Sequence, residues 1–346
     1  MCILNSMSSS HPLRIFFITG LITIISLAGV WAGLGPSALF LTFVLILIEV
    51  TFSFDNAIIN ARILTGMSAF WQQMFMTVGM VIAVFGMRLV FPIVLVMLTA
   101  HLGAGQVIDL TLHHPEEYAA KLIHAHPYIA SFGGMFLLML ALAFFFDPGR
   151  KVHWIAIIER PLQQLGRWWI YTLISIVTLL VVAITPFNTH PSETLVAGSI
   201  GIVLFLALNL LTSSIDISED TKSKRKKQTA WSGLVAFLYL QVLDSSFSLD
   251  GVIGAFAITQ DVILITIGLG VGALWVRSLT LFMVRRQTLS VYRYLEHGAH
   301  YTILVLALVL LCSLFFDIPE FIAGGAGLII VGLSVAGSIA ESKAGK

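Results

Sequence analysis

Long apolar stretches dominate this sequence, and they determine which folds it can adopt. A helix needs roughly 20 mostly apolar residues to cross a hydrocarbon core of about 30 Å. Such stretches occur at about 15–32, 37–62, 74–98, 129–146, 168–187, 193–212, 232–258, 262–284, 300–316 and 320–339. Charged residues make up only 11% of the chain, against roughly 25% in soluble proteins. We therefore expect an all-α, polytopic transmembrane bundle of about ten helices.

The segments between these helices differ in their content of Lys and Arg. Segments 147–167, 213–231, 285–299 and the C-terminal tail carry most of the basic residues, whereas 99–128 carries only Lys121. The positive-inside rule makes the basic segments cytoplasmic, which places both termini inside. The stretch from Ile15 lacks a small-residue cleavage site, so we expect it to be the first span. Short loops suggest a bacterial inner membrane, and the net charge of +1 suggests no nucleic-acid partner.

A short polar motif occurs twice. Residues 49–56 align without gaps against 244–251, sharing an acid, two residues, Phe, Ser, an apolar residue and Asp. Each copy is followed by an intramembrane arginine, Arg88 or Arg277. The copies lie five expected helices apart, so they cross the membrane in opposite directions. This predicts an inverted repeat of five plus five helices, with residues 1–187 and 188–346 as its halves and 213–231 as a charged cytoplasmic loop, as in many secondary transporters.

Six charged residues lie well inside the expected spans, and all six belong to the repeated helices. They are Glu49, Asp55, Arg88, Asp244, Asp250 and Arg277. Placing a charge at the centre of a span costs at least about 2.5–3.5 kcal/mol, so such residues face the bundle interior and indicate function. Four acids against two bases leave a negative surplus. This surplus suits a divalent cation with oxygen ligands.

The helical period separates the motif residues into two directions. Glu49, Ser53, Asn56 and Asn60 share one face, and so do Gln241, Asp244, Ser248 and Gly251, whereas Asp55 and Asp250 point about 120° away. Two explanations are open. Either the helices are interrupted near the motifs, or the aspartates pair with the arginines.

Simpler structural interpretations are also open. The acids and arginines can form ion pairs that only fix helix packing, and Ser53, Asn60, Gln241 and Ser248 can serve as helix contacts. Segment 101–126 carries five histidines that can capture metal outside, although an amphipathic interfacial segment is the simpler interpretation. Lysine and histidine are absent from the middle of the expected spans, so we expect no retinal, haem or other organic cofactor.

Glu49, Ser53, Asp55 and Asn56, spaced as Glu-x-x-x-Ser-x-Asp-Asn, and Asp244 and Asp250 in the second copy resemble the TerC family of integral membrane proteins. The chain is most similar to a longer, poorly characterised branch of that family. The resemblance implies a role in manganese efflux or in supplying metal to exported proteins. It also implies Glu49, Asp55, Asn56, Asp244 and Asp250 as cation ligands. The second copy departs from the family, because Gly-Val-Ile-Gly follows Asp250 where a Ser-Ile-Pro-Ala-like run is usual.

These observations favour a transporter over an enzyme. We expect an exporter of a divalent metal such as manganese, with protons as a plausible counter-ion. The alternative is a membrane metallation or assembly factor that binds metal without net flux and contacts a protein partner that the sequence does not identify. An intramembrane aspartyl protease is disfavoured, because Asp250 lacks a Gly-x-Gly-Asp setting and the acids form two symmetry-related pairs.

Overall fold

The chain is an all-helical integral membrane protein. The computed structural model describes residues 12–213, 230–316 and 318–344, and no strand occurs among them. Within these ranges, seven helices are long and apolar enough to cross a membrane, or eight if the bent pair α9 and α10 forms one span. The first half contains α1 (Pro12–Phe52), α2 (Phe54–Thr65), α3 (Ala69–Met76), α4 (Val78–Val81), the π-helix η2 (Ile82–Val90), α5 (Phe91–Ala100), α6 (Ala104–His113), α7 (Pro115–His124) and α8 (His126–Phe145).

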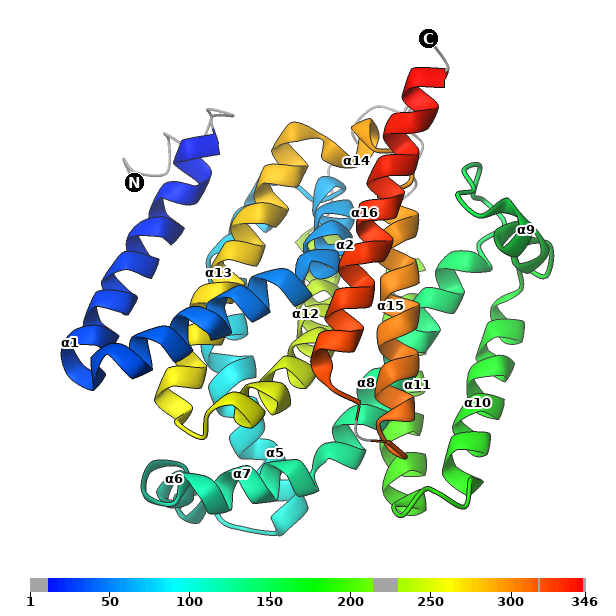
Figure 1. Ribbon diagram of the computed structural model, residues 1–346. Coiled ribbons are helices and arrows are strands. Elements are labelled where there is room, and N and C mark those ends of the chain that lie inside the picture. The colour runs from blue at the N-terminus through cyan, green and yellow to red at the C-terminus, as the bar shows by residue number, and fades with distance from the viewer. Residues whose placement is uncertain (1–11, 214–229, 317, 345–346) are drawn as a thin grey trace. The chain divides into compact units, whose positions relative to one another are not determined.

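The helices of the second half follow in chain order (Figure 1). They are α9 (Ala156–Gln164), α10 (Trp168–Ile184), α11 (Pro191–Ser213), α12 (Ala230–Ile258), α13 (Val262–Arg286), α14 (Thr288–Val291), α15 (Leu295–Cys312) and α16 (Glu320–Ala344). The expected spans from 129–146 onward match α8, α10, α11, α12, α13, α15 and α16. Of these, α10 is a candidate span only as part of the bent pair, and α12, which carries the second polar motif, is not among the seven.

The expected span at 15–32 matches the first limb of α1, whereas the expected span at 37–62 is divided between two helices. The two limbs of α1 meet at Gly35, whose φ of 85° and ψ of −177° are accessible mainly to glycine. Pro36 then begins the second limb, a position where its missing N–H costs nothing. Figure 1 shows the resulting V shape in blue. The second expected span is therefore the second limb of α1 followed by α2.

One compact unit comprises residues up to 65, 73–125 and 247–289. Within it, α1 packs against α13 along both limbs. A Cβ on Gly268 would lie 2.5 Å from Leu45 Cβ, and one on Gly272 would lie 2.5 Å from Glu49 Cβ. Glycines four residues apart thus let the two helices approach closely, the small-residue packing typical of helices in lipid. On the first limb, Trp275 Nε1 donates to Thr23 Oγ1 at 2.9 Å.

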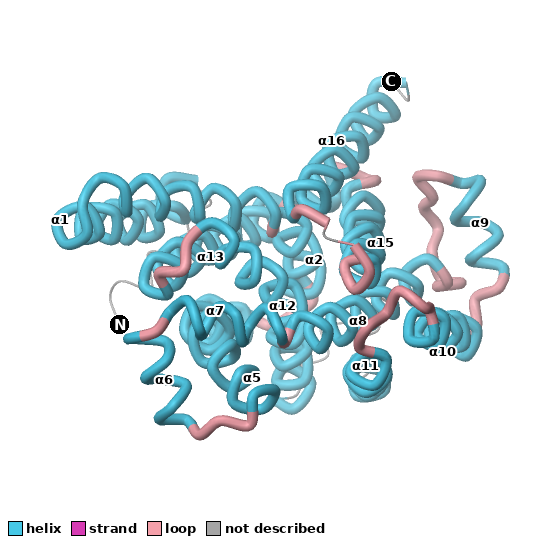
Figure 2. Tube along the Cα trace, turned by 60° about the horizontal axis from the view of Figure 1, so that its bottom comes forward, coloured by secondary structure: helices cyan, strands magenta, loops and turns pink. Residues whose placement is uncertain are grey.

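The other compact unit comprises residues 66–72, 126–246 and 290–346. Its centre is α8, which contacts α11 and α15, while α16 packs on α15 (Figure 2). Glycines again mark the close approaches: a Cβ on Gly201 would lie 2.5 Å from the Phe132 carbonyl oxygen, and one on Gly298 would lie 2.3 Å from Ser334 Oγ. Each unit draws on segments that are distant in sequence. The division into repeats at 1–187 and 188–346 stays a prediction.

Candidate functional site

The first motif lies where a helix is interrupted. The α1 helix ends at Phe52 and α2 begins at Phe54, so Ser53 separates them. Asp55 therefore occupies the first turn of a new helix, where the helix dipole stabilises a carboxylate. The second motif differs, because α12 continues from Ala230 to Ile258 through it. Of the two explanations open from the sequence, interruption thus applies to the first copy and not to the second.

Glu49 and Arg88 form a buried ion pair, and their side chains are only 6% and 4% exposed. Arg88 Nη2 donates to Glu49 Oε1, and Ser53 Oγ donates to the same oxygen at 3.2 Å. The other terminal nitrogen, Nη1, donates to the Ala83 carbonyl at 2.6 Å. The arginine thus pairs with the glutamate of the motif, whereas the sequence had offered the aspartate as its partner.

The helix that carries Arg88 has an unusual winding. Residues Ile82–Val90 form a π-helix, and Phe91 N–H donates to the carbonyl of Gly86, five residues earlier. Such wider turns are rare and occur frequently at functional sites. Here the π-helix carries the arginine that reaches Glu49.

Buried polar groups continue from the break into α2. Asp55, Asn56 and Asn60 are among the eight buried residues of this 12-residue helix. Asn56 Oδ1 has no hydrogen-bond partner within the part of the chain that the structure describes. A buried oxygen without a donor is costly unless another group binds it, and a carboxamide oxygen is a typical ligand for hard cations.

Part of the second motif lies beside Glu49. A Cβ built on Gly251 would be 3.6 Å from Glu49 Oε2, so the carboxylate lies against this position of α12. The side chains of Ser248 and Asp250 are outside the described residues. Arg277 is almost fully buried; it donates from Nη1 to the Phe75 carbonyl at 2.5 Å and lies 4.1 Å from the centre of that ring.

Gln241 and Asp244 belong to the other compact unit. Gln241 is buried, and neither of its side-chain polar atoms has a hydrogen-bond partner among the described residues. Asp244 is partly buried. The structure thus brings Glu49, Ser53 and Arg88 into direct contact. Across the described ranges, no three His, Cys, Asp or Glu side chains gather closely enough to hold a metal ion.

The histidine-rich segment 101–126 forms two short amphipathic helices, α6 and α7. Val107 and Thr111 of α6 and Tyr118 and Leu122 of α7 are buried. The histidines at 101, 113, 114 and 124 are exposed instead. His113 Nδ1 lies 2.8 Å from Asp109 Oδ1, one turn earlier. This arrangement agrees with an interfacial segment whose polar face meets water.

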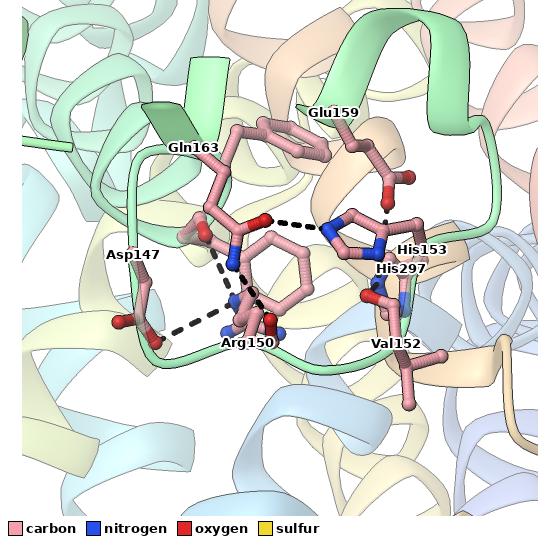
Figure 3. A pocket seen from close by; sticks show the side chains of 9 residues that line it. Asp147, Arg150, Val152, His153, Glu159, Gln163 and His297 are labelled. Carbon is pink, nitrogen blue, oxygen red and sulfur yellow. Dashed lines mark hydrogen bonds and ion pairs between the residues drawn. The ribbon is translucent and has the colours of Figure 1, made fainter. Parts of the chain in front are cut away.

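A second buried charged cluster, between the ends of α8, α9 and α15, was missed by the sequence reasoning (Figure 3). His297 Nε2 lies 3.4 Å from Glu159 Oε2, and both side chains are 4% exposed. Nearby, Arg150 lies 3.0 Å from the centre of the Phe144 ring and donates from Nε to the carbonyl of that residue. These residues line a small, partly open space of about 10 Å³, which has room for about one water. The sequence did not reveal this cluster, because its residues occur in segments rich in exposed charge and share no regular spacing.

Comparisons with known proteins give one family. The family described as "Protein of unknown function (DUF475)" matches residues 54–345. The matched range includes α2 and the second motif, and it begins after Glu49. Searches among curated proteins and among solved structures found no match. Because the family match covers most of its length, the chain belongs to the DUF475 family.

Proposed function

We propose that the protein is a membrane transporter of divalent metal cations, with its intramembrane site at the first motif. Glu49, Asp55 and Asn56 supply the ligands in this proposal, and the resemblance of the second motif implies Asp250 as a further ligand. These oxygen ligands suit hard divalent cations. Among such cations, the resemblance of the motifs to the TerC family favours manganese.

The helix break at Ser53 between two buried carboxylates carries the proposal. Transporter helices are commonly discontinuous at the substrate site, where freed backbone groups and side chains meet the ion. Here Glu49 lies just before the break and Asp55 just after it. Asn56 adds an oxygen that no donor binds within the described chain. This combination of buried acids and an unmatched oxygen suits a cation better than it suits a purely structural contact.

Arg88 gives the site a built-in competitor. Its guanidinium binds Glu49 Oε1, so a cation that binds this carboxylate through both oxygens must displace the arginine. Competition of this kind keeps affinity moderate, as release on the far side of a membrane requires. In the inverted-repeat design, two halves alternate in opening the site to either side. We propose export, with protons as counter-ions, across a bacterial inner membrane with both termini cytoplasmic.

Manganese binding by the purified protein tests the proposal. The electron paramagnetic resonance signal of free Mn²⁺ falls when the ion binds, so titration gives an affinity. We expect binding by the wild type and a loss of at least about tenfold in Asp55→Asn, since an interaction with a charged partner contributes about 1.5–3 kcal/mol. Ser131→Ala is the matched control, because Ser131 Oγ is also buried and without a hydrogen-bond partner among the described residues.

Equal affinity in Asp55→Asn and the wild type would contradict the proposal. Manganese binding that requires Asp55 but is never followed by flux into proteoliposomes would favour the metallation factor instead. The two functions share the site and differ only in the movement of the ion, so binding and flux together separate them.

A further inference from the structure

We propose that α9 lies in the headgroup layer of the membrane and binds anionic phospholipid through Arg160 and Arg167. The helix joins the end of α8 to the start of α10 within one compact unit. This inference is independent of the proposed transport function, since no residue of the metal site takes part.

The angle between α9 and α10 gives the orientation. The two helices are bent by 109° across a break of a few residues. Membrane-spanning helices tilt on average about 20° from the bilayer normal. If α10 crosses the membrane, α9 therefore runs nearly parallel to the membrane plane. The tryptophans that begin α10, Trp168 and Trp169, are exposed at the corner, where aromatic residues mark the membrane interface.

The face that α9 turns away from the protein is apolar. Ile157 is 89% exposed and Leu165, at the C-cap, is 54% exposed, while Glu159 is 3% exposed on the opposite face. At 100° per residue, Ile157, Ile158, Pro161 and Leu165 fall within one arc of about 100°. This inverts the pattern of a helix in water, in which the carboxylate would be outside and the isoleucines inside. It is the pattern of a helix whose outer face meets acyl chains.

Contacts of Glu159 fix this rotation. Its carboxylate accepts the backbone N–H groups of Trp154 and Ile155 at 3.0 and 3.2 Å and lies 3.4 Å from His297 Nε2 (Figure 3). Gln163, one turn later, donates to the Arg150 carbonyl at 2.6 Å. Two successive turns of α9 are thus held with the same face inward. The exposure of Ile157 is a consequence of this attachment.

The charges around the apolar arc select the lipid. Arg160 and Arg167 are exposed, and neither forms an ion pair with another described residue. Arg160 lies about 60° from Ile157 around the helix, at the edge of the apolar arc. Long basic side chains in this position extend to the phosphate layer while their stems stay in the apolar region. An arc of isoleucine and leucine flanked by unpaired arginines complements an anionic bilayer surface.

Depth measurement tests the placement. A spin label at Ile157→Cys, in a background with both natural cysteines replaced by serine, reports collisions with oxygen in lipid and with a nickel complex in water. In liposomes, we expect the label at 157 to favour oxygen several-fold more than a label at Lys343→Cys, an exposed position near the end of α16. Equal nickel collisions at both positions would overturn the proposal, because α9 would then lie in water. A label at 157 shielded from both reagents would mean that another protein segment covers α9, which also overturns it.

The preference for anionic lipid is tested by removing the charges of Arg160 and Arg167. We expect native mass spectrometry of the full-length protein to show retained phosphatidylglycerol in preference to phosphatidylcholine. That preference should fall about tenfold in a variant carrying Arg160→Gln and Arg167→Gln, since each basic residue near an anionic surface adds to the attraction. Lys121→Gln with Lys343→Gln is the matched control and should keep the preference. An equal loss in both double variants would overturn the headgroup assignment.

Discussion

At the scale of single residues, the unusual feature is a carboxylate and a guanidinium buried together beside a helix break. Removing charges from water is expensive, and mutual attraction offsets the cost only when the geometry is good. Glu49 meets this condition, since Arg88 and Ser53 both donate to its Oε1. The burial of each side chain is therefore tolerated only while the other is present.

Removing one partner should cost more than removing both. We expect Glu49→Gln to lower the free energy of unfolding by about 3–5 kcal/mol, because it leaves Arg88 buried without a counter-charge. The double variant with Arg88→Gln should recover part of that loss. Thermal unfolding in detergent of the wild type, Glu49→Gln, Arg88→Gln and the double variant measures the coupling between the two side chains. Strictly additive effects of the two substitutions would show that the side chains do not interact.

For Asn56, we expect a substitution to affect manganese binding more than the stability of the fold. Its Oδ1 accepts no hydrogen bond among the described residues, so Asn56→Ala should lower the free energy of unfolding by much less than Glu49→Gln. Manganese affinity should nevertheless fall by about tenfold or more, because a ligand to a charged ion is lost. A variant with unchanged affinity and reduced stability would assign Asn56 to packing.

At the scale of elements, close helix contact positions Glu49. The second limb of α1 crosses α13 where Gly268 and Gly272 leave no side chain between the helices. Any larger residue there must displace the limb that holds the glutamate. Packing and the candidate site are therefore coupled through one glycine.

Gly272→Ala should disturb both stability and the site. Its Cβ would lie 2.5 and 2.6 Å from Cβ and Cγ of Glu49, closer than real contacts allow. Overpacking of this kind costs about 1–3 kcal/mol. Gly29→Ala on the first limb of α1 is the matched control, because nothing lies within 4 Å of its added Cβ. Equal melting temperatures for the two variants would contradict the close contact.

The elements also show what sequence reasoning reaches and where it stops. Hydropathy predicted the long helices α8, α10, α11, α12, α13, α15 and α16 to within a few residues, because twenty apolar residues in lipid have few alternatives to a helix. The turn at 33–36 was foreseen, and Gly35 explains it. The pairing of Arg88 with Glu49 was not foreseen, because the register of the π-helix Ile82–Val90 cannot be inferred from an ideal helical wheel. The cluster at Glu159 and His297 depends on contacts between segments with no shared pattern.

At the scale of the whole molecule, the orientation in the membrane follows from the basic segments. The distribution of Lys and Arg predicts that both termini face the cytoplasm and that 99–128 is outside. His113, on α6, and Lys343, near the end of α16, are both exposed and report these two sides.

A cysteine at each position tests that topology in a background with both natural cysteines replaced by serine. An impermeant maleimide added to intact cells should label His113→Cys and leave Lys343→Cys unlabelled until the cells are opened. Labelling of both from outside, or the reverse order, would contradict the predicted orientation and the inverted arrangement derived from it.

Transport itself is the central claim, and manganese flux into proteoliposomes tests it most directly. The account predicts Mn²⁺ entry with the wild type, loss of entry when Asp55→Ala and Asp250→Ala are combined, and retention with Ser131→Ala. Magnesium, calcium and zinc in parallel identify the preferred ion. Absence of flux with every ion, in protein that is folded and correctly inserted, would contradict the account, because the buried acids would then hold the helices together without moving a cation.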